Sequence, residues 1–525
     1  YYNSQSKRDQ GTGFGWSFSY SRKVTVLGNS IRVTRDDGYT EYFNCSSSPC
    51  QGGSDTLFRV TKDANGYSIT DAADTVEQYA PNGLLQLITY VSGITDTPGY
   101  DAQNRLDRVD QSTGEYIRFT YDSTGRLETL LANDETRAWG YRYDAIGNLV
   151  YVDNPDSTVR QYHYEDTNSP RWLTRITDER GNRYATFEYN ANGEATASYH
   201  GPQTSTLTDR IDGVSITYNG DGSRTVTNSN GNPSTYTTTT QVGISLTTDI
   251  TGPGCSSCGT GNTSYSYDPA NNNLLSKTEN TITTEFGNYD ANGNPGFMIE
   301  AKGTSEERRT DYTYDPGFFS KLATVTEPSV FTGSNKVTSY SYDAYGNRTA
   351  ETVDGFTPTG IPVLRTTTYQ YNGPFHQLSQ VNGPRIAVDD ITTLRYYADD
   401  PLEGNNRARL KEIEDANGNL IRSNIQYTAT GKVASEDQPN GLSLGYTYYP
   451  GNDRLETLTE ADGVTSQVTR WTYLATGEVQ SITTAEGSAD AATLMFTYDT
   501  ARRLTDISDG LGNEIHFKLD TEGNV

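Results

Sequence analysis

The stretch Tyr121-Asp122-Ser123-Thr124-Gly125-Arg126-Leu127 decides the fold, because variants of it recur along most of the chain. A close copy, Tyr143-Asp144-Ala145-Ile146-Gly147-Asn148-Leu149, follows 22 residues later, and two more begin at Tyr289 and Tyr342. Most copies are spaced by 21 to 30 residues. A period of this length is typical of stacked supersecondary units. The sequence therefore predicts a repeat array instead of a single compact globule.

Each repeat is defined by a tyrosine, the aspartate that follows it and a glycine three residues after the aspartate. The residues predicted to carry this structural role are Tyr100, Tyr121, Asp122, Gly125, Tyr143, Asp144, Gly147, Tyr267, Tyr289, Asp290, Gly293, Tyr314, Tyr342, Asp343, Gly346 and Tyr498. Looser variants occur at Tyr189, Tyr427 and Tyr473. We expect the repeat tyrosines to stack along one face of the array.

Polar and apolar residues alternate on both sides of the turn, as in Glu115-Tyr116-Ile117-Arg118-Phe119-Thr120-Tyr121. Alternation over four to eight residues indicates a strand with two unlike faces. Asp, Asn and Gly at the centre suit a tight reversal, since Asp and Asn bond nearby backbone and Gly accepts a positive φ. A second turn, such as Asp178-Glu179-Arg180-Gly181-Asn182, then starts the next repeat. The pattern predicts an all-β chain of antiparallel strands and hairpins, nearly free of helix.

These motifs resemble those of the Rhs/YD-repeat proteins, which include bacterial Rhs polymorphic toxins, the C component of insecticidal Tc toxins and the shell of teneurins. The opening Gly13-Phe14-Gly15-Trp16-Ser17 is similar to the start of Rhs shells, and Asp37-Gly38-Tyr39-Thr40-Glu41-Tyr42-Phe43 is similar to the element that follows it. Leu173-Thr174-Arg175-Ile176-Thr177-Asp178 is also typical of the family. The resemblance covers nearly the whole chain and implies a spiral β-cocoon around a cavity that can hold a toxin domain.

In such proteins, a self-cleaving core segment and a variable toxin lie beyond the repeats. This sequence begins at Tyr1 and ends at Val525 in the middle of a repeat, so we expect a piece of a longer polypeptide. The resemblance therefore assigns neither self-cleavage nor toxicity to any residue here.

The composition fits a thin wall better than a thick core. The hydrophobic fraction is 33%, and 39 of the 525 residues are tyrosine. Aliphatic residues are too few for the core that a chain of this length would normally bury. Disorder would require few aromatic and β-branched residues, whereas here they are abundant and regularly placed. Cross-strand pairs that each add about 0.2–1 kcal/mol then supply stability from many small contributions.

The net charge is −26, from 67 acidic and 41 basic residues. The sequence contains no run of Lys and Arg that could bind the phosphates of a nucleic acid, so no nucleic-acid partner is predicted. Acidic side chains that keep a large surface soluble explain this balance, and an acidic interior that holds a basic cargo is the alternative. No window of about 20 apolar residues is present, which predicts no membrane-spanning segment.

The four cysteines form two close pairs, Cys45 with Cys50 and Cys255 with Cys258, in loops rich in Ser, Gly and Pro. The even number of cysteines and their close spacing within each pair favour two disulfide-closed loops in an exported protein. Free thiols, a zinc site from all four sulfurs and a redox Cys-x-x-Cys remain the alternatives.

No catalytic or cofactor motif stands out. The Asp-x-Asn-Gly turns lack the EF-hand positions for glycine and glutamate, so hairpin chemistry explains them better than calcium does. His163, His200, His376 and His516 are scattered, and no Gly-x-Ser-x-Gly is present. The tryptophans suit packing better than a sugar-binding platform. We therefore predict no enzyme, no metal and no cofactor.

The chain divides into four stretches of one continuous β-spiral. Residues 1–95 hold the Gly-Trp opening and the first Cys loop, and residues 96–200 form a regular array. Residues 201–264, rich in Thr, Ser and Gly, lose the register, and residues 265–525 resume it. About 24 residues per unit gives roughly 20 hairpin units.

Two functional classes are consistent with these features. The first is the non-catalytic shell of an exported protein that encapsulates and helps deliver its own C-terminal effector, with secretion machinery or neighbouring shell segments as further partners. The second is an extracellular scaffold, adhesin or filament that acts through its outer surface. Both place the protein in a secreted or cell-surface setting.

Overall fold

A computed structural model describes residues 1–4, 6, 9, 11–53, 56–204, 206, 209–254, 261–331, 333–385, 388 and 390–525. Strands hold 51% of the chain and helix 3%, so the all-β prediction is confirmed. The strands form two sheets in which neighbouring strands pair antiparallel. A small sheet has the order β1 (Lys23–Leu27), β2 (Ser30–Thr34), β3 (Thr40–Asn44).

The large sheet contains the other 39 strands, which pair in sequence order. Its first part comprises β4 (Arg59–Asp63), β5 (Gly66–Thr70), β6 (Val76–Tyr79), β7 (Leu85–Thr89), β8 (Thr95–Tyr100), β9 (Leu106–Gln111), β10 (Tyr116–Tyr121), β11 (Leu127–Ala132), β12 (Ala138–Tyr143), β13 (Leu149–Asp153), β14 (Val159–His163), β15 (Arg175–Thr177), β16 (Arg183–Tyr189), β17 (Ala195–His200), β18 (Ile211–Tyr218), β19 (Arg224–Asn228), β20 (Pro233–Gln241) and β21 (Ile244–Thr251).

The second part comprises β22 (Thr263–Tyr267), β23 (Leu274–Glu279), β24 (Ile282–Gly287), β25 (Phe297–Glu300), β26 (Arg308–Tyr314), β27 (Leu322–Pro328), β28 (Asn335–Tyr342), β29 (Arg348–Phe356), β30 (Pro362–Gln370), β31 (Gln380–Asn382), β32 (Ile391–Tyr396), β33 (Leu410–Glu414), β34 (Leu420–Tyr427), β35 (Val433–Asp437), β36 (Ser443–Tyr448), β37 (Leu455–Ala461), β38 (Ser466–Tyr473), β39 (Val479–Thr484), β40 (Ala492–Tyr498), β41 (Leu504–Asp509) and β42 (Glu514–His516). Short 3₁₀ turns lie at η2 (Pro374–His376), η3 (Pro401–Asn406) and η4 (Pro439–Gly441).

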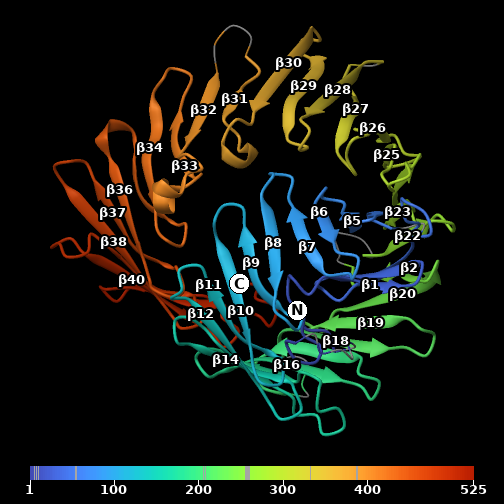
Figure 1. Cartoon of the computed structure of the whole chain (residues 1–525), viewed down its shortest axis with the longest axis horizontal. Helices are drawn as coiled ribbons and strands as arrows, with labels where there is room; N and C mark the ends of the chain where they lie inside the picture. Colours follow the sequence, from blue (N-terminus) through green and yellow to red (C-terminus); the bar gives the residue numbers. More distant parts are fainter. Residues whose placement is uncertain are drawn as a thin grey trace.

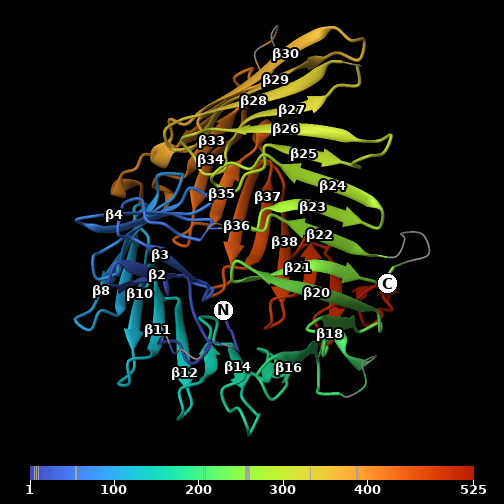
Figure 2. The same ribbon diagram turned by 90° about the vertical axis from the view of Figure 1, so that its right-hand side faces the viewer.

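The sheet winds around a common axis as an open spiral. Strands follow one another around a ring in Figure 1, from blue through green and yellow to red, and Figure 2 shows the ring from the side. In the described part of the chain, the edge strands β4 and β42 pair only with β5 and β41. The stretch at 201–264, where the repeat register is lost, contributes β18 to β21 to the same sheet.

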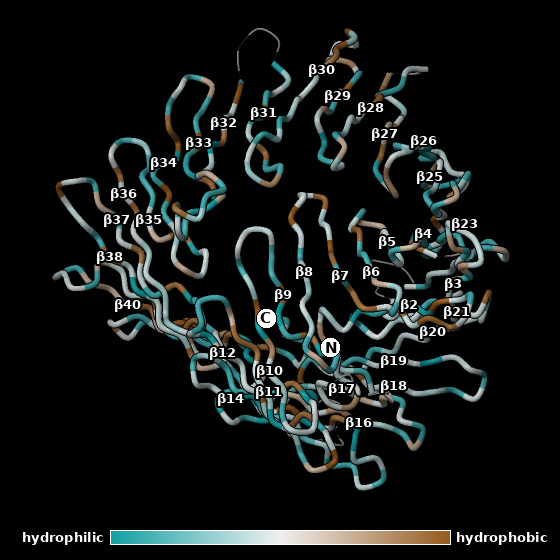
Figure 3. Tube along the Cα trace, viewed as in Figure 1, coloured by the Kyte–Doolittle hydropathy of each residue, from teal (hydrophilic) through white to brown (hydrophobic). Residues whose placement is uncertain are grey.

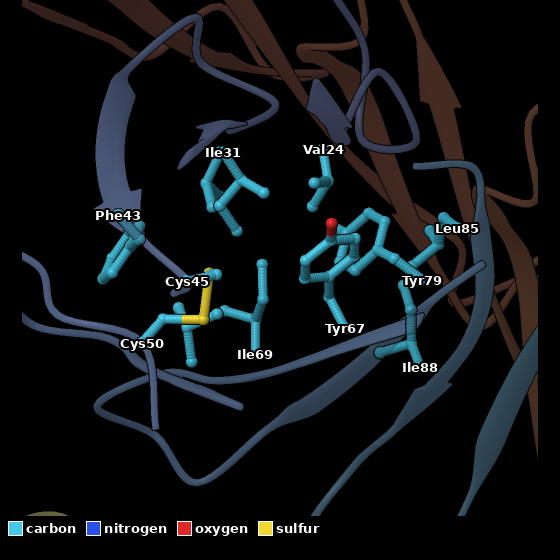
Figure 4. Close-up of a cluster of buried hydrophobic side chains, with 12 residues drawn as sticks. Val24, Ile31, Phe43, Cys45, Cys50, Tyr67, Ile69, Tyr79, Leu85 and Ile88 are labelled. Carbon is cyan, nitrogen blue, oxygen red and sulfur yellow. A yellow bond between two sulfur atoms is a disulfide. The ribbon is translucent and has the colours of Figure 1, made fainter. Parts of the chain in front are cut away.

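The wall has no thick apolar core along most of its length. Hydrophobic and hydrophilic residues are interspersed along the strands in Figure 3, as the alternation in the sequence predicts. A compact core lies instead near the N-terminus, where the small sheet packs on the first strands of the large one (Figure 4). Ile31, Val33, Val60 and Ile69 are 0–1% exposed there.

Candidate functional site

The repeat tyrosines fasten each hairpin to the one before it. The Tyr143 hydroxyl donates to the Leu127 carbonyl at 2.8 Å, and Tyr121 donates to Leu106 at 2.7 Å. In most repeats the acceptor is the first residue of the strand that follows the turn of the preceding repeat, as Leu127 is in β11. Equivalent bonds are made by Tyr100, Tyr164, Tyr189, Tyr218, Tyr267, Tyr289, Tyr314, Tyr342, Tyr371, Tyr396, Tyr427, Tyr448 and Tyr498.

Because these tyrosines occupy the same position in their hairpins and make the same bond, they lie on one face of the sheet. Their rings do not stack on one another: within the described ranges, no ring pair joins successive members of the series. Cations from the preceding turn cover the rings instead. The guanidinium of Arg105 lies 4.5 Å from the Tyr121 ring centroid, and that of Arg126 lies 4.8 Å from Tyr143.

The aspartate after the tyrosine builds the turn. The Asp122 carboxylate accepts hydrogen bonds from the backbone N–H groups of Thr124 and Arg126, while the Gly125 N–H donates to the Asp122 carbonyl. Desolvation pushes its pKa up, but hydrogen bonds from Thr124 and Arg126 outweigh this and lower the pKa of Asp122 to about 2.

Glycine closes the turn because the backbone there is left-handed. Gly125 has φ +86° and Gly147 has φ +91°. The pairing shifts by one residue at Tyr121, where Thr120 faces Thr129 but Tyr121 faces Leu127. A positive-φ glycine next to such a shift is the β-bulge arrangement of short hairpin loops.

Two successive windings of the spiral meet end to end along a line that we call the seam. The first winding covers residues 59–230 and the second covers residues 290–524. Tyr-Asp turns of the second winding contact the opposite hairpin ends of the first. The Asp74 carboxylate accepts from the Phe319 N–H at 2.7 Å, and the Lys321 ammonium lies 3.5 Å from Asp74. The Arg59 guanidinium donates to the Phe318 carbonyl at 3.1 Å.

Ion pairs continue along the seam. Arg409 pairs with Glu115 at 2.5 Å, and Arg137 pairs with Asp453 at 2.6 Å. Further on, the Arg502 guanidinium reaches Glu179 at 3.1 Å. The seam ends where the Glu522 carboxylate accepts from the Ser229 N–H and Asn230 donates to Asp520. These contacts lie between residues far apart in sequence, so no local motif signalled them.

The N-terminal segment crosses the Tyr-Asp turns of the first winding. The Leu127 N–H donates to the Gly11 carbonyl at 2.7 Å, and the Trp16 indole donates to the Tyr164 hydroxyl at 2.9 Å. Gly13 has φ +93°, and a Cβ there would lie 2.9 Å from the Leu149 nitrogen. The Gly-Trp opening thus binds successive repeat turns.

A buried ion cluster anchors the chain beyond this segment. Glu77 is 1% exposed, and its carboxylate accepts from Arg22, Arg35 and the Tyr79 hydroxyl at 2.5–2.8 Å. Desolvation opposes ionisation, yet the hydrogen bonds from Arg35 and Tyr79 and the charges of Arg35 and Arg22 keep the pKa of Glu77 below its usual range. No local motif signals this cluster, because its members come from three separated stretches of the chain.

The Cys45–Cys50 disulfide is present, which confirms that prediction. It lies in the N-terminal core of Figure 4. Cys255 and Cys258 lie outside the described residues, and a bond between them stays a prediction.

The histidines are dispersed and engaged separately. His163 bonds the Thr177 hydroxyl at 2.9 Å and the Arg175 guanidinium at 2.9 Å, and burial together with the Arg175 charge lowers its pKa. His376 stacks on Tyr345 with ring centroids 3.5 Å apart. Within the described residues, no three His, Cys, Asp or Glu side chains form a group that could hold a metal ion. Nor is any helix among them long and apolar enough to cross a membrane.

Strands linked by Tyr-Asp turns and wound into a continuous wall define a YD-repeat shell. Comparison with known proteins agrees: residues 86–213 match the family model described as teneurin YD-shell. No curated protein sequence matches the chain.

Two solved structures share the fold. The crystal structure of TcdB2-TccC3-Cdc42 is 12% identical with a TM-score of 0.53, over 90% of this chain and 26% of that one. TcdB2-TccC3 without its hypervariable C-terminal region is also 12% identical, with a TM-score of 0.54, over 91% of this chain and 26% of that one. The chain spans about a quarter of those structures, and together the findings support a shell of the YD/Rhs type.

Proposed function

We propose that this chain is the non-catalytic wall of a container that encloses a C-terminal effector domain and helps to deliver it. The seam carries the proposal. The ion pairs of the seam hold one winding of the spiral against the next, as a continuous wall around an interior requires. The shared fold with TcdB2-TccC3 supports the same conclusion.

The proposed setting is secreted or extracellular. A disulfide at Cys45–Cys50 suits an oxidising compartment. The proposed partners are the effector domain as cargo and neighbouring shell segments or secretion machinery at the wall's outer surface. Among the described residues the histidines are dispersed, and the turn aspartates are hydrogen-bonded within their own turns. We therefore propose no group of side chains for acid–base or nucleophilic catalysis.

Small-angle X-ray scattering combined with a protection assay tests the container. A small protease-sensitive domain is fused after Val525, and its digestion is compared with that of the free domain. We expect a hollow particle in scattering and slower digestion of the fused domain. The double variant Arg409→Ala/Arg502→Ala removes the ion pairs of Arg409 with Glu115 and of Arg502 with Glu179 and Asp178, and it should restore fast digestion. A solid particle, or digestion as fast as that of the free domain, would contradict the proposal.

An extracellular scaffold is the second candidate, and one observation favours it. Apolar side chains lie at hairpin ends of the second winding, on the edge opposite the Tyr-Asp turns: Val330, Val464 and Leu511 are each at least 90% exposed. Apolar side chains exposed on the same edge are groups that a partner surface would remove from water. Concentration-dependent assembly that Val464→Ser abolishes, with no hollow particle at any concentration, would favour the scaffold.

A further inference from the structure

A cavity of about 370 Å³ lies in the seam. The first winding contributes residues of β12 to β14 and of the loop 154–158, and the second contributes residues of the loops 449–454 and 474–478. This volume is in the range of small-molecule sites. The container proposal assigns this cavity no role.

The carboxylates that line the cavity already have partners. Asp156 accepts from the Thr158 hydroxyl at 2.6 Å and from the Asn452 amide at 3.1 Å. Glu179 pairs with Arg160 at 2.9 Å and with Arg502 at 3.1 Å. The acceptors that the protein supplies here are therefore in use.

One basic side chain that lines the cavity is not matched in this way. Arg454 forms no ion pair within the described residues. Its guanidinium donates to the Leu474 carbonyl at 3.3 Å and lies 5.8 Å from the Tyr473 ring centroid. Guanidinium groups bind carboxylates strongly. The cavity therefore favours a ligand with an anionic hydrogen-bond acceptor.

The remaining walls favour a ring with hydroxyl groups. Trp139 and Tyr162 line the cavity. Both lie on the same face of the sheet as Arg160. Arg160 and Tyr141 are each paired with Val152 on neighbouring strands, and Tyr162 and Trp139 are two residues along their strands from Arg160 and Tyr141. Aromatic faces accommodate a flat or ring-shaped body. Side chains able to hydrogen-bond hydroxyl groups complete the lining: Asn154, Thr158, Asn452 and Thr476.

We propose that the seam cavity binds a small acidic sugar, a pyranose that carries a carboxylate. The carboxylate pairs with the Arg454 guanidinium, the ring lies against Trp139, and the hydroxyls bond the amide and hydroxyl side chains. Since both windings line the site, the bound sugar holds them together and stabilises the closed wall.

Isothermal titration and thermal unfolding with glucuronate test the proposal, with glucose and sodium chloride at equal concentration as controls. Glucuronate should bind and raise the melting temperature in proportion to occupancy, and glucose should bind at least about tenfold more weakly because it lacks the charge-assisted bonds. The variant Arg454→Gln keeps a donor for the Leu474 carbonyl and removes the guanidinium charge, so affinity should fall about tenfold or more.

Arg142→Gln is the matched control. Arg142 pairs with Asp153 on the exposed surface of β12 and β13, outside the cavity, so this variant should bind glucuronate as the parent does. Lack of glucuronate binding at 10 mM, binding equal to that of glucose, or full affinity in Arg454→Gln would each overturn the proposal. A stabilisation that inorganic phosphate reproduces and glucuronate does not would overturn the sugar assignment.

Discussion

At the scale of the residue, the repeat tyrosine is a hydrogen-bond donor as much as an aromatic group. Its hydroxyl reaches a backbone carbonyl of the preceding hairpin at 2.6–3.1 Å in nearly every repeat, and the Tyr289 hydroxyl makes the same bond to Leu274. Phenylalanine would keep the ring but leave this carbonyl without its donor. The repeat position therefore favours tyrosine over phenylalanine.

Replacing Tyr143 by phenylalanine should lower the free energy of unfolding by about 1 kcal/mol, because the bond to the Leu127 carbonyl is lost. Urea denaturation followed by circular dichroism measures the change. The control is Tyr151→Phe, since Tyr151 is a strand residue for which the structure gives no hydroxyl bond. Equal losses in the two variants would show that the ladder of hydroxyl bonds adds nothing specific.

Replacing Gly147 by valine should lower the free energy of unfolding by about 1–3 kcal/mol, because a β-branched residue resists φ +91°. The first side-chain carbon itself fits, since a Cβ there would first meet Arg126 at an ordinary 3.4 Å. Thermal unfolding compares it with Gly99→Ala, where φ is ordinary and the nearest atom lies 3.7 Å away. A stable Gly147→Val variant would mean that the turn adopts another backbone.

At the scale of the element, hairpins could be predicted from the sequence and their docking could not. Alternation and the Asp-x-x-Gly turn are local, so a stretch such as Glu115 to Leu130 specifies two strands and the turn between them. The expected stacking of tyrosine on tyrosine was replaced by Arg-over-Tyr contacts. Arg105 and Arg126 directly follow the left-handed turn residues Asn104 and Gly125, and each reaches the next repeat tyrosine. The pairing of Glu115 with Arg409 depends on how far the spiral turns, which no short motif encodes.

The seam is tested by Arg502→Ala. Arg502 is 16% exposed, bonds Glu179 and covers the Tyr184 ring at 4.3 Å. We expect a loss of about 1–3 kcal/mol, with faster hydrogen exchange in residues 178–184 and 499–503 and unchanged exchange in distant ladders. Arg142→Ala, which removes an exposed pair within one hairpin, should cost at most about 1 kcal/mol and leave those loops protected. Uniformly faster exchange in Arg502→Ala would argue against a discrete seam.

At the scale of the whole molecule, the tyrosines make the wall sensitive to alkali. Burial raises the pKa of Tyr100, Tyr121 and Tyr314 from 10.0 to about 12. Since the folded state holds these protons more tightly than the unfolded chain, their contribution is complete below pH 10 and is lost as the pH rises towards 12. Unfolding free energies measured from pH 8 to 12, with tyrosinate absorbance, should fall over that interval. Constant stability up to pH 12 would contradict this prediction.

The seam also constrains how the gene can change. Its partners are separated by 233 residues at Arg59 and Asn292, by 294 at Glu115 and Arg409, and by 323 at Glu179 and Arg502. Removing one hairpin from residues 116–143 would leave every other turn intact, yet each later loop of the first winding would face a turn of the second winding other than its own partner. Insertions should therefore be tolerated where they lengthen loops on the edge of the second winding opposite the Tyr-Asp turns. The gain or loss of a whole repeat inside either winding should be selected against.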